Sequence, residues 1–110
     1  MPDKLDVLQG TLDLLILRTL QWGPQHGHGI GQVIRARSGE LLQVEHGSLY
    51  PALNRLRREG WIESEWGTTD NNQRARFYRL TESGKQKLMA EESRWKLMVK
   101  TMARVLRPQD

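Results

Sequence analysis

The chain has 110 residues, the length of a single domain, with 37% hydrophobic residues, 27% charged residues and a net charge of +4. It contains no cysteine, which excludes disulfides, zinc ribbons and thiol catalysis, and no apolar run of the roughly 18 residues that a membrane span needs. The first ten residues carry acids and lack the apolar segment of a signal peptide, so we expect a soluble protein of the cytoplasm.

The first half of the chain predicts two helices and a turn. Leucine and isoleucine recur at helical spacing over residues 8 to 22, with Thr11 as the expected N-cap and Asp13 in the first turn. A glycine-rich turn follows, and a second helix is predicted over residues 27 to 38. Residues 40 to 46 alternate loosely and predict either a short strand or an extended loop.

A third helix is predicted to begin at Ser48, as its N-cap, and to end at Gly60. Its leucines fall on one face at the spacing i, i+3, i+4 and i+7, so this face should be buried. At about 100° per residue, the side chains that point away from it are Asn54, Arg55 and Arg58, with Tyr50 and Arg57 at its flank.

Residues 61 to 66 and 74 to 80 predict two antiparallel strands, because aromatic and β-branched residues mark them and a polar, glycine-containing turn separates them. Alternate residues of a strand share a face. Arg74 and Arg76 should therefore project together near the tip of this hairpin.

Thr81 is the expected cap of a last helix over residues 82 to 106, in whose first turn Gly84 is a small local cost. An apolar stripe runs along this helix, and so small a domain cannot cover it. We therefore expect a homodimer whose interface consists of Leu88, Trp95, Met98, Met102 and Val105.

The four tryptophans are expected to serve two purposes. Trp22, Trp61 and Trp66 are predicted to pack in the core or at the base of the hairpin. Trp95 is predicted to anchor the interface between subunits. Alternatively, it forms the wall of a flat pocket for an aromatic effector, a pocket lined by Trp95, Met89, Met98 and Met102.

Basic residues concentrate in the third helix and the hairpin. Residues 71 to 80 hold three arginines and no acid, whereas the first 30 residues hold two cations and three acids. Arginine can pair with guanine and asparagine with adenine in the major groove of duplex DNA. The residues expected to contact DNA are Ser48, Tyr50, Asn54, Arg55, Arg58, Arg74 and Arg76.

The predicted fold is mainly α with a small antiparallel β-wing. We expect a winged helix-turn-helix domain that binds DNA over residues 1 to 80, followed by a long dimerisation helix and tail over residues 81 to 110. An alternative is a winged-helix module that binds another protein and no specific DNA. A third hypothesis keeps the DNA-binding output but adds sensing of a metal or a small molecule.

Catalytic and metal-binding patterns are weak. No phosphate-binding loop, dinucleotide fingerprint or nucleophile motif occurs, so we expect neither an enzyme nor a cofactor. His26, His28 and His46 are the only histidines, and their spacing is a weak signal for a metal site. We therefore expect no metal, and we interpret these histidines as turn residues, with His28 capping or packing.

Four motifs together resemble the PadR family of bacterial transcriptional regulators: GTLDLLILRTL, HGHGI, GSLYPALNRLRREGWIESEW and RARFYRLTESGKQKL. The resemblance covers residues 6 to 100. It implies a repressor that dimerises through its C-terminal helix, with help from the N-terminal helix, and that binds a palindromic operator. It also implies that Tyr50, Arg74 and Arg76 contact DNA. Some relatives release DNA when a phenolic acid or planar aromatic drug binds at the dimer interface.

The chain departs from this family at two places. His28 stands where the family often has tyrosine, and Arg57 with Arg58 stands where an acid commonly follows the arginine–leucine pair. The second departure makes the predicted recognition helix more basic than in the relatives. Operator preference is therefore not carried over from the resemblance.

Overall fold

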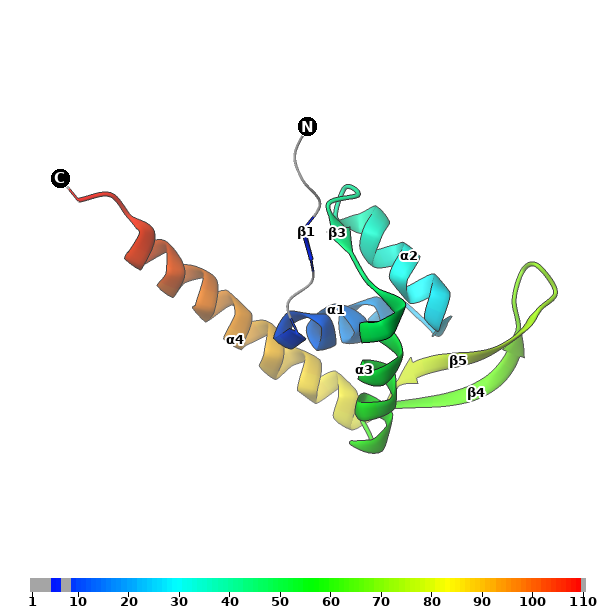
Figure 1. Ribbon diagram of the computed structural model, residues 1–110. Helices are drawn as coiled ribbons and strands as arrows, with labels where there is room; N and C mark the ends of the chain where they lie inside the picture. The colour runs from blue at the N-terminus through cyan, green and yellow to red at the C-terminus, as the bar shows by residue number, and fades with distance from the viewer. Residues whose placement is uncertain (1–4, 7–8, 110) are drawn as a thin grey trace.

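The computed structural model describes residues 5–6 and 9–109. Figure 1 shows a helical head, a β-hairpin that projects from one side of it, and a long last helix that leaves on the other side. This is the predicted architecture, mainly helical with a small antiparallel β-wing. The elements in chain order are β1 (Leu5–Asp6), α1 (Gln9–Gln21), β2 (Gln25–His26), α2 (Gly27–Arg37), β3 (Leu42–Gln43), α3 (His46–Arg58), β4 (Ile62–Thr68), β5 (Arg74–Leu80) and α4 (Glu82–Leu106).

The hydrophobic core lies where α1, α2 and α3 meet, and the first strand of the hairpin and the start of α4 close it. Each helix contributes apolar residues spaced three or four apart, which places them on one face. Because α3 buries all of its leucines, its opposite face is left for solvent or a ligand. The side chains that are less than 2% exposed are Ile16, Leu17, Ile30, Leu49, Leu53, Leu56, Ile62 and Leu88.

Two helices begin earlier than the sequence predicts. The helix α1 starts at Gln9, so Thr11 lies inside its first turn instead of capping it. The helix α3 starts at His46, so Ser48 is also inside the first turn, and its backbone N–H donates to the carbonyl oxygen of Glu45 at 3.0 Å. Both expected caps are wrong for one reason: the first turn carries no core residue, so the apolar pattern starts a turn late.

The predicted hairpin is part of a sheet of three strands in the order β2–β5–β4. The strands β4 and β5 pair in register from Ile62 opposite Leu80 to Thr68 opposite Arg74. The short strand β2 joins the other edge of β5, with His26 opposite Phe77. This third strand, which the sequence analysis did not predict, ties the turn between α1 and α2 to the base of the wing.

The segment between α2 and α3 forms a short strand, one of the two options that its sequence predicted. The strand β3 pairs in parallel with β1, with Leu42 opposite Leu5. A left-handed residue, Glu40 with φ of 67°, comes just before it. The carboxylate of Glu40 forms an ion pair with the guanidinium of Arg35 at 2.6 Å, which fixes the turn that leads out of α2.

The start of α4 is fixed by its cap and by a glycine. The hydroxyl of Thr81 accepts a hydrogen bond from the Gly84 N–H at 3.0 Å, as predicted, and donates to the carbonyl oxygen of Gly60 at 2.6 Å. A Cβ atom at Gly84 would lie 1.9 Å from the carbonyl oxygen of Trp61. Gly84 is therefore required for the close approach of α4 to the end of α3, and the prediction of a merely local cost is wrong.

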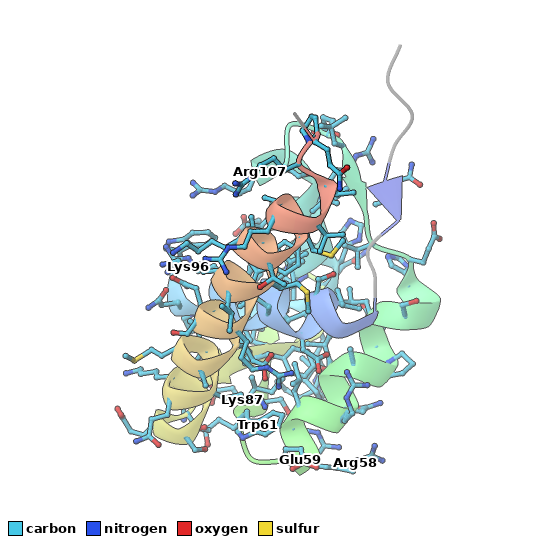
Figure 2. All side chains as sticks on the ribbon, turned by 90° about the vertical axis from the view of Figure 1, so that its left-hand side faces the viewer. Arg58, Glu59, Trp61, Lys87, Lys96 and Arg107 are labelled. Atoms are coloured by element: carbon cyan, nitrogen blue, oxygen red, sulfur yellow. The ribbon has the colours of Figure 1, made fainter. Side chains whose placement is uncertain are left out.

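Two of the three tryptophans expected in the core are at the surface. Trp22 is 51% exposed and Trp66 is 56% exposed. The guanidinium of Arg37 lies 4.4 Å from the ring centre of Trp22. Trp61 alone packs partly against the core, with the ammonium of Lys87 at 4.4 Å from its ring, and Figure 2 shows these two side chains next to one another. A cation on the ring stabilises each of these exposed positions.

The helix α4 divides into two halves. In its first half Leu88 is 1% exposed and belongs to the core of the protomer, so its predicted place in a dimer interface is wrong. The second half runs beyond the head, as Figure 1 shows. There the apolar side chains of Trp95, Met98 and Met102 are 45 to 52% exposed. Among the described residues, no helix is long and apolar enough to cross a membrane.

Candidate nucleic-acid interface

The exposed face of α3 carries a polar and basic row. Tyr50 is 41% exposed, and Asn54, Arg57 and Arg58 are exposed over the two turns that follow it. The prediction placed Arg57 at the flank of the buried face, but the structure places it with the outward residues. Ser48 is exposed in the first turn of the same helix. Figure 2 shows Arg58 at the far end of α3, clear of α4.

Arg55 does not belong to this outward row. Its guanidinium forms an ion pair and a hydrogen bond with the carboxylate of Asp13 in α1. The two side chains are 38% and 24% exposed, so the pair lies at the edge of the core. The prediction that Arg55 points away with Asn54 is therefore wrong, because a carboxylate 42 residues earlier in the chain draws it toward α1.

Asp13 is held in a partly dehydrated position. Burial raises the pKa of its carboxyl group, and the neighbouring Arg55 offsets only part of this effect. Glu91 of α4 raises this pKa further, while Lys87 lowers it. Lys87 and Glu91 also pair with each other at 2.9 Å. Charged side chains of α1, α3 and α4 thus meet at one junction, which fixes how α3 sits on the head.

On the wing, two arginines share one tryptophan. The guanidinium of Arg74 lies 4.6 Å from the ring centre of Trp66, and that of Arg76 lies 5.1 Å from it. Trp66 and Arg76 are directly opposite one another in the β4–β5 ladder. The predicted projection of both arginines together is therefore confirmed. Their neighbour Arg79 instead forms an ion pair with Glu63 at 2.7 Å.

A groove of about 580 Å³ separates α3 from the wing. The buried Tyr78 forms part of its lining, and burial raises the pKa of this phenol although the guanidiniums of Arg76 and Arg57 oppose the shift. The phenol of Tyr50 lies against the backbone of Gly27, where an added Cβ would be 2.7 Å from the ring. The groove is lined by residues of α2, α3 and the wing, among them His26, His28, Tyr50, Trp66, Arg74, Arg76 and Tyr78.

The predictions did not anticipate a row of aromatic rings beside this groove. The ring of Phe77 contacts His26 at 5.4 Å between centres, and His26 stacks on His28 at 6.4 Å. His28 meets His46 at 5.9 Å, and His46 meets Tyr50 at 5.8 Å. The row therefore connects the wing, the start of α2 and the start of α3. The sequence signal for it was weak, since only the spacing of His26 and His28 was visible.

The histidines have separate roles. The Nδ1 atom of His26 accepts a hydrogen bond from the Gly29 N–H at 3.1 Å, so His26 is the N-cap of α2. The prediction had assigned a capping role to His28, which is exposed at the following turn. Within residues 5–6 and 9–109, no group of three histidine or acidic side chains is placed to hold a metal ion.

A second surface lies on the far half of α4. Seven residues on a helix return to nearly the same direction, so the exposed Trp95 and Met102 share a stripe with the buried Leu88. Met89 is 70% exposed but lies about 120° around the helix from Trp95. The predicted pocket of Trp95, Met89 and Met98 therefore cannot form on one face of this helix. The other exposed apolar residues of the stripe are Met98, Val99, Val105 and Leu106.

The helices α2 and α3, with the β4–β5 wing beside α3, define a winged helix-turn-helix protein. The description "Transcriptional regulator PadR-like family" matches residues 16–90. The chain belongs to this family of transcriptional regulators, which confirms the resemblance found in the sequence.

Solved structures and a curated relative agree with this assignment. A transcriptional regulator from Clostridium thermocellum has a TM-score of 0.82 and 29% identity, covering 90% of this chain and 96% of that one. A PadR family transcription regulator from Clostridium difficile R20291 has a TM-score of 0.74 and 28% identity, with coverages of 87% and 98%. The negative transcriptional regulator PadR of Bacillus subtilis (strain 168) is 31% identical over 77 residues, which are 70% of this chain but 42% of that protein.

Proposed function

We propose that this chain represses transcription by binding a palindromic duplex operator as a homodimer. The observation that carries the proposal is the shared groove, which has the exposed face of α3 on one side and the arginine-bearing wing on the other. Asn54, Arg57 and Arg58 would reach base edges in the major groove, because amides and guanidiniums can form paired hydrogen bonds there. Ser48, Tyr50, Arg74 and Arg76 would contact the sugar–phosphate backbone, with the wing arginines next to the minor groove.

Arg55 has a different part in this proposal. Its guanidinium is committed to Asp13, so it positions α3 on α1 instead of reading a base. This separates the basic residues of α3 into one that holds the helix and two that face outward. Arg57 replaces Arg55 among the residues proposed to contact DNA.

The dimer is supported by the bare stripe on α4. Trp95, Met98 and Met102 lie side by side on the half of the helix that the protomer leaves uncovered. A second copy of α4 would cover this stripe and hold two heads about one helical turn of DNA apart, as a palindrome requires. A repressing role is supported by the similarity to the negative regulator of Bacillus subtilis. Such a regulator acts on the chromosome, so we infer a cytoplasmic location.

The stripe also supports an effector site between subunits. A planar aromatic molecule would stack on Trp95 and contact Met98 of one copy and the same residues of the other. Met89 is no longer part of this site. Quenching of tryptophan emission by planar aromatic compounds should disappear in a Trp95→Ala variant that still dimerises, and quenching that persists in this variant contradicts the effector site.

The DNA-binding part is tested with duplexes that tile the promoter upstream of the protein's own coding sequence. At low salt, one duplex should bind more tightly than a random duplex, and its affinity should fall steeply as salt rises. Replacing Arg57 and Arg58 together by alanine should remove the preference. Replacing Arg104, an exposed arginine about 180° from Trp95 on α4, should leave it unchanged.

Two results would count against specific DNA binding. One is equal affinity for every promoter duplex and the random duplex. The other is an Arg57→Ala, Arg58→Ala variant that keeps the operator preference. Either result would favour the alternative of a winged-helix module that binds another protein.

The dimer is tested by analytical ultracentrifugation at micromolar concentration. Met102→Glu should yield a monomer, because the charge falls within the proposed interface. Leu97→Glu is the matched control, since Leu97 is 64% exposed but lies about 160° around the helix from Trp95. It should remain a dimer, and a wild-type monomer would refute the proposed assembly.

A further inference from the structure

All three histidines of the chain lie in the ring row beside the groove. His26 is partly buried and uses its Nδ1 atom to cap α2. His28 and His46 are exposed, and their ring centres are 5.9 Å apart. In the described part of the chain, their only partners are other aromatic rings. Their ring nitrogens are therefore available to a ligand that approaches the groove.

The charges around this pair leave room for an anion. A hollow of about 250 Å³ lies on one side of it and is lined by His28, His46, Arg35 and Glu45, among others. The guanidinium of Arg35 is already paired with Glu40. On the other side, the groove presents Arg74 and Arg76 together with Asp70, Tyr50 and Tyr78. No carboxylate within the described residues forms an ion pair with either histidine.

We propose that His28 and His46 form a proton-dependent phosphate contact on the DNA-binding surface, so that DNA affinity rises as pH falls from 8 to 6. This inference rests on the proposed function, because the ligand is a phosphate of bound duplex DNA. Imidazole gains its positive charge between about pH 5 and 8, the one side chain whose unperturbed charge changes there. The two rings continue the basic surface of Arg74 and Arg76 toward the start of α3.

The sign of the effect follows from linkage. A phosphate binds the protonated imidazole better than the neutral one, so DNA binding is accompanied by proton uptake. Affinity must then increase with proton concentration across the range in which the rings titrate. A symmetric dimer carries four such imidazoles, which makes the dependence steeper than one ring would give.

The first experiment measures affinity for one promoter duplex at pH 6, 7 and 8 at fixed ionic strength. The wild type should bind about tenfold more tightly at pH 6 than at pH 8, since a shift of one pKa unit on binding corresponds to a tenfold change. The His28→Gln, His46→Gln double variant should vary by less than about twofold. Both histidines are exposed, so this variant should keep the wild-type circular dichroism spectrum and melting temperature.

His26→Asn is the matched control, because asparagine can also accept the N-cap hydrogen bond. This variant removes one imidazole of the same ring row but should keep the pH dependence of the wild type. If the dependence is lost with His26 and kept without His28 and His46, the assignment to the exposed pair is wrong.

The second experiment measures the salt dependence at pH 6 and pH 8. Each neutralised phosphate adds about 0.9 to the slope of log affinity against log salt concentration. The wild-type slope should therefore be steeper at pH 6 by about 2 to 4, and the double variant should have the same slope at both values. A random duplex should show the same pH effect, since phosphates carry no sequence information. An effect confined to the operator would indicate base contacts and overturn the phosphate assignment.

The outcomes separate this inference from the proposed function. If the operator binds specifically but with equal affinity at pH 6 and 8, the histidine contact is refuted and the function stands. If no duplex is preferred at any pH, the proposed function itself fails.

Discussion

The winged head and the far half of α4 both expose large aromatic side chains, but in different surroundings. On the head, Trp66 carries the guanidiniums of Arg74 and Arg76, and it borders a polar groove. On α4, Trp95 has methionine, valine and leucine as neighbours on its stripe, and no cation stacks on it in the described part of the chain. The exposed fraction alone does not identify a partner. A ring that holds arginines suits a polyanion, and a ring in an apolar stripe suits another apolar surface.

The joint between these two regions gives the largest expected effect. Gly84→Ala should lower the free energy of unfolding by about 3 kcal/mol, because the added Cβ meets backbone atoms of Trp61 that cannot move independently. Chemical denaturation measures this change. Gly10→Ala in α1 is the control, since nothing lies within 4 Å of its Cβ position, and it should be neutral or slightly stabilising. Wild-type stability of Gly84→Ala would show that α4 can dock without this close approach.

The two halves of the α4 stripe should respond differently to truncation. Leu88→Ala should cost about 3 kcal/mol of protomer stability, because Leu88 is 1% exposed in the core. Its effect on the melting temperature should not depend on protein concentration. Met102→Ala should act through the proposed dimer, so its effect should change with concentration. If both variants showed the same concentration dependence, the division of the stripe into core and interface would be wrong.

Local patterns predicted most of the fold. The bounds of α2 and α4, the β4–β5 wing and the Thr81 cap all follow from periodicity, caps and turns within a few residues. The starts of α1 and α3 were missed because their first turns contribute nothing to the core. Gly84 was misjudged because its neighbour, the carbonyl of Trp61, becomes close only when the chain has folded back.

The candidate site was harder to predict, since its details depend on residues that are distant in sequence. Arg55 and Arg57 look alike on a helical projection, but only Arg55 has Asp13 of α1 within reach. The ring row joins three segments, and its members His28 and His46 are 18 positions apart in the sequence. Spacing along the chain therefore predicted which surface is basic, whereas the fold decides which arginines and histidines belong to it.

The two exposed tryptophans of the head permit a matched test of the wing. Trp66→Ala should weaken operator binding about tenfold, because it removes the ring that orients Arg74 and Arg76. The slope of log affinity against log salt should stay the same, since both charges remain. Trp22→Ala removes a ring that also carries arginines but lies outside the groove, and it should change affinity by less than about twofold. A reduced salt slope for Trp66→Ala would contradict a purely orienting role.

The smallest expected effect concerns the ion pair beneath the reading helix. Asp13→Asn should change the free energy of unfolding by less than about 1 kcal/mol, although it removes the partner of Arg55. The reason is that burial raises the pKa of Asp13 overall, so the fold already favours its neutral form. Between the ordinary pKa of 3.8 and the raised value, the folded chain binds a proton more tightly than the unfolded chain. The contribution of Asp13 to stability therefore falls as pH rises through this window.

Urea denaturation at pH 7 and pH 4.5 tests this sign. The stability of the wild type relative to Asp13→Asn should increase toward pH 4.5, where the wild-type carboxyl group takes up its proton. A loss of more than about 2 kcal/mol at pH 7, or a relative stability that decreases toward acid, would show that the attraction to Arg55 outweighs dehydration. In that case Asp13 would be a strong clamp on α3. On the present geometry it is a weak one, and it keeps Arg55 away from DNA at little cost to the fold.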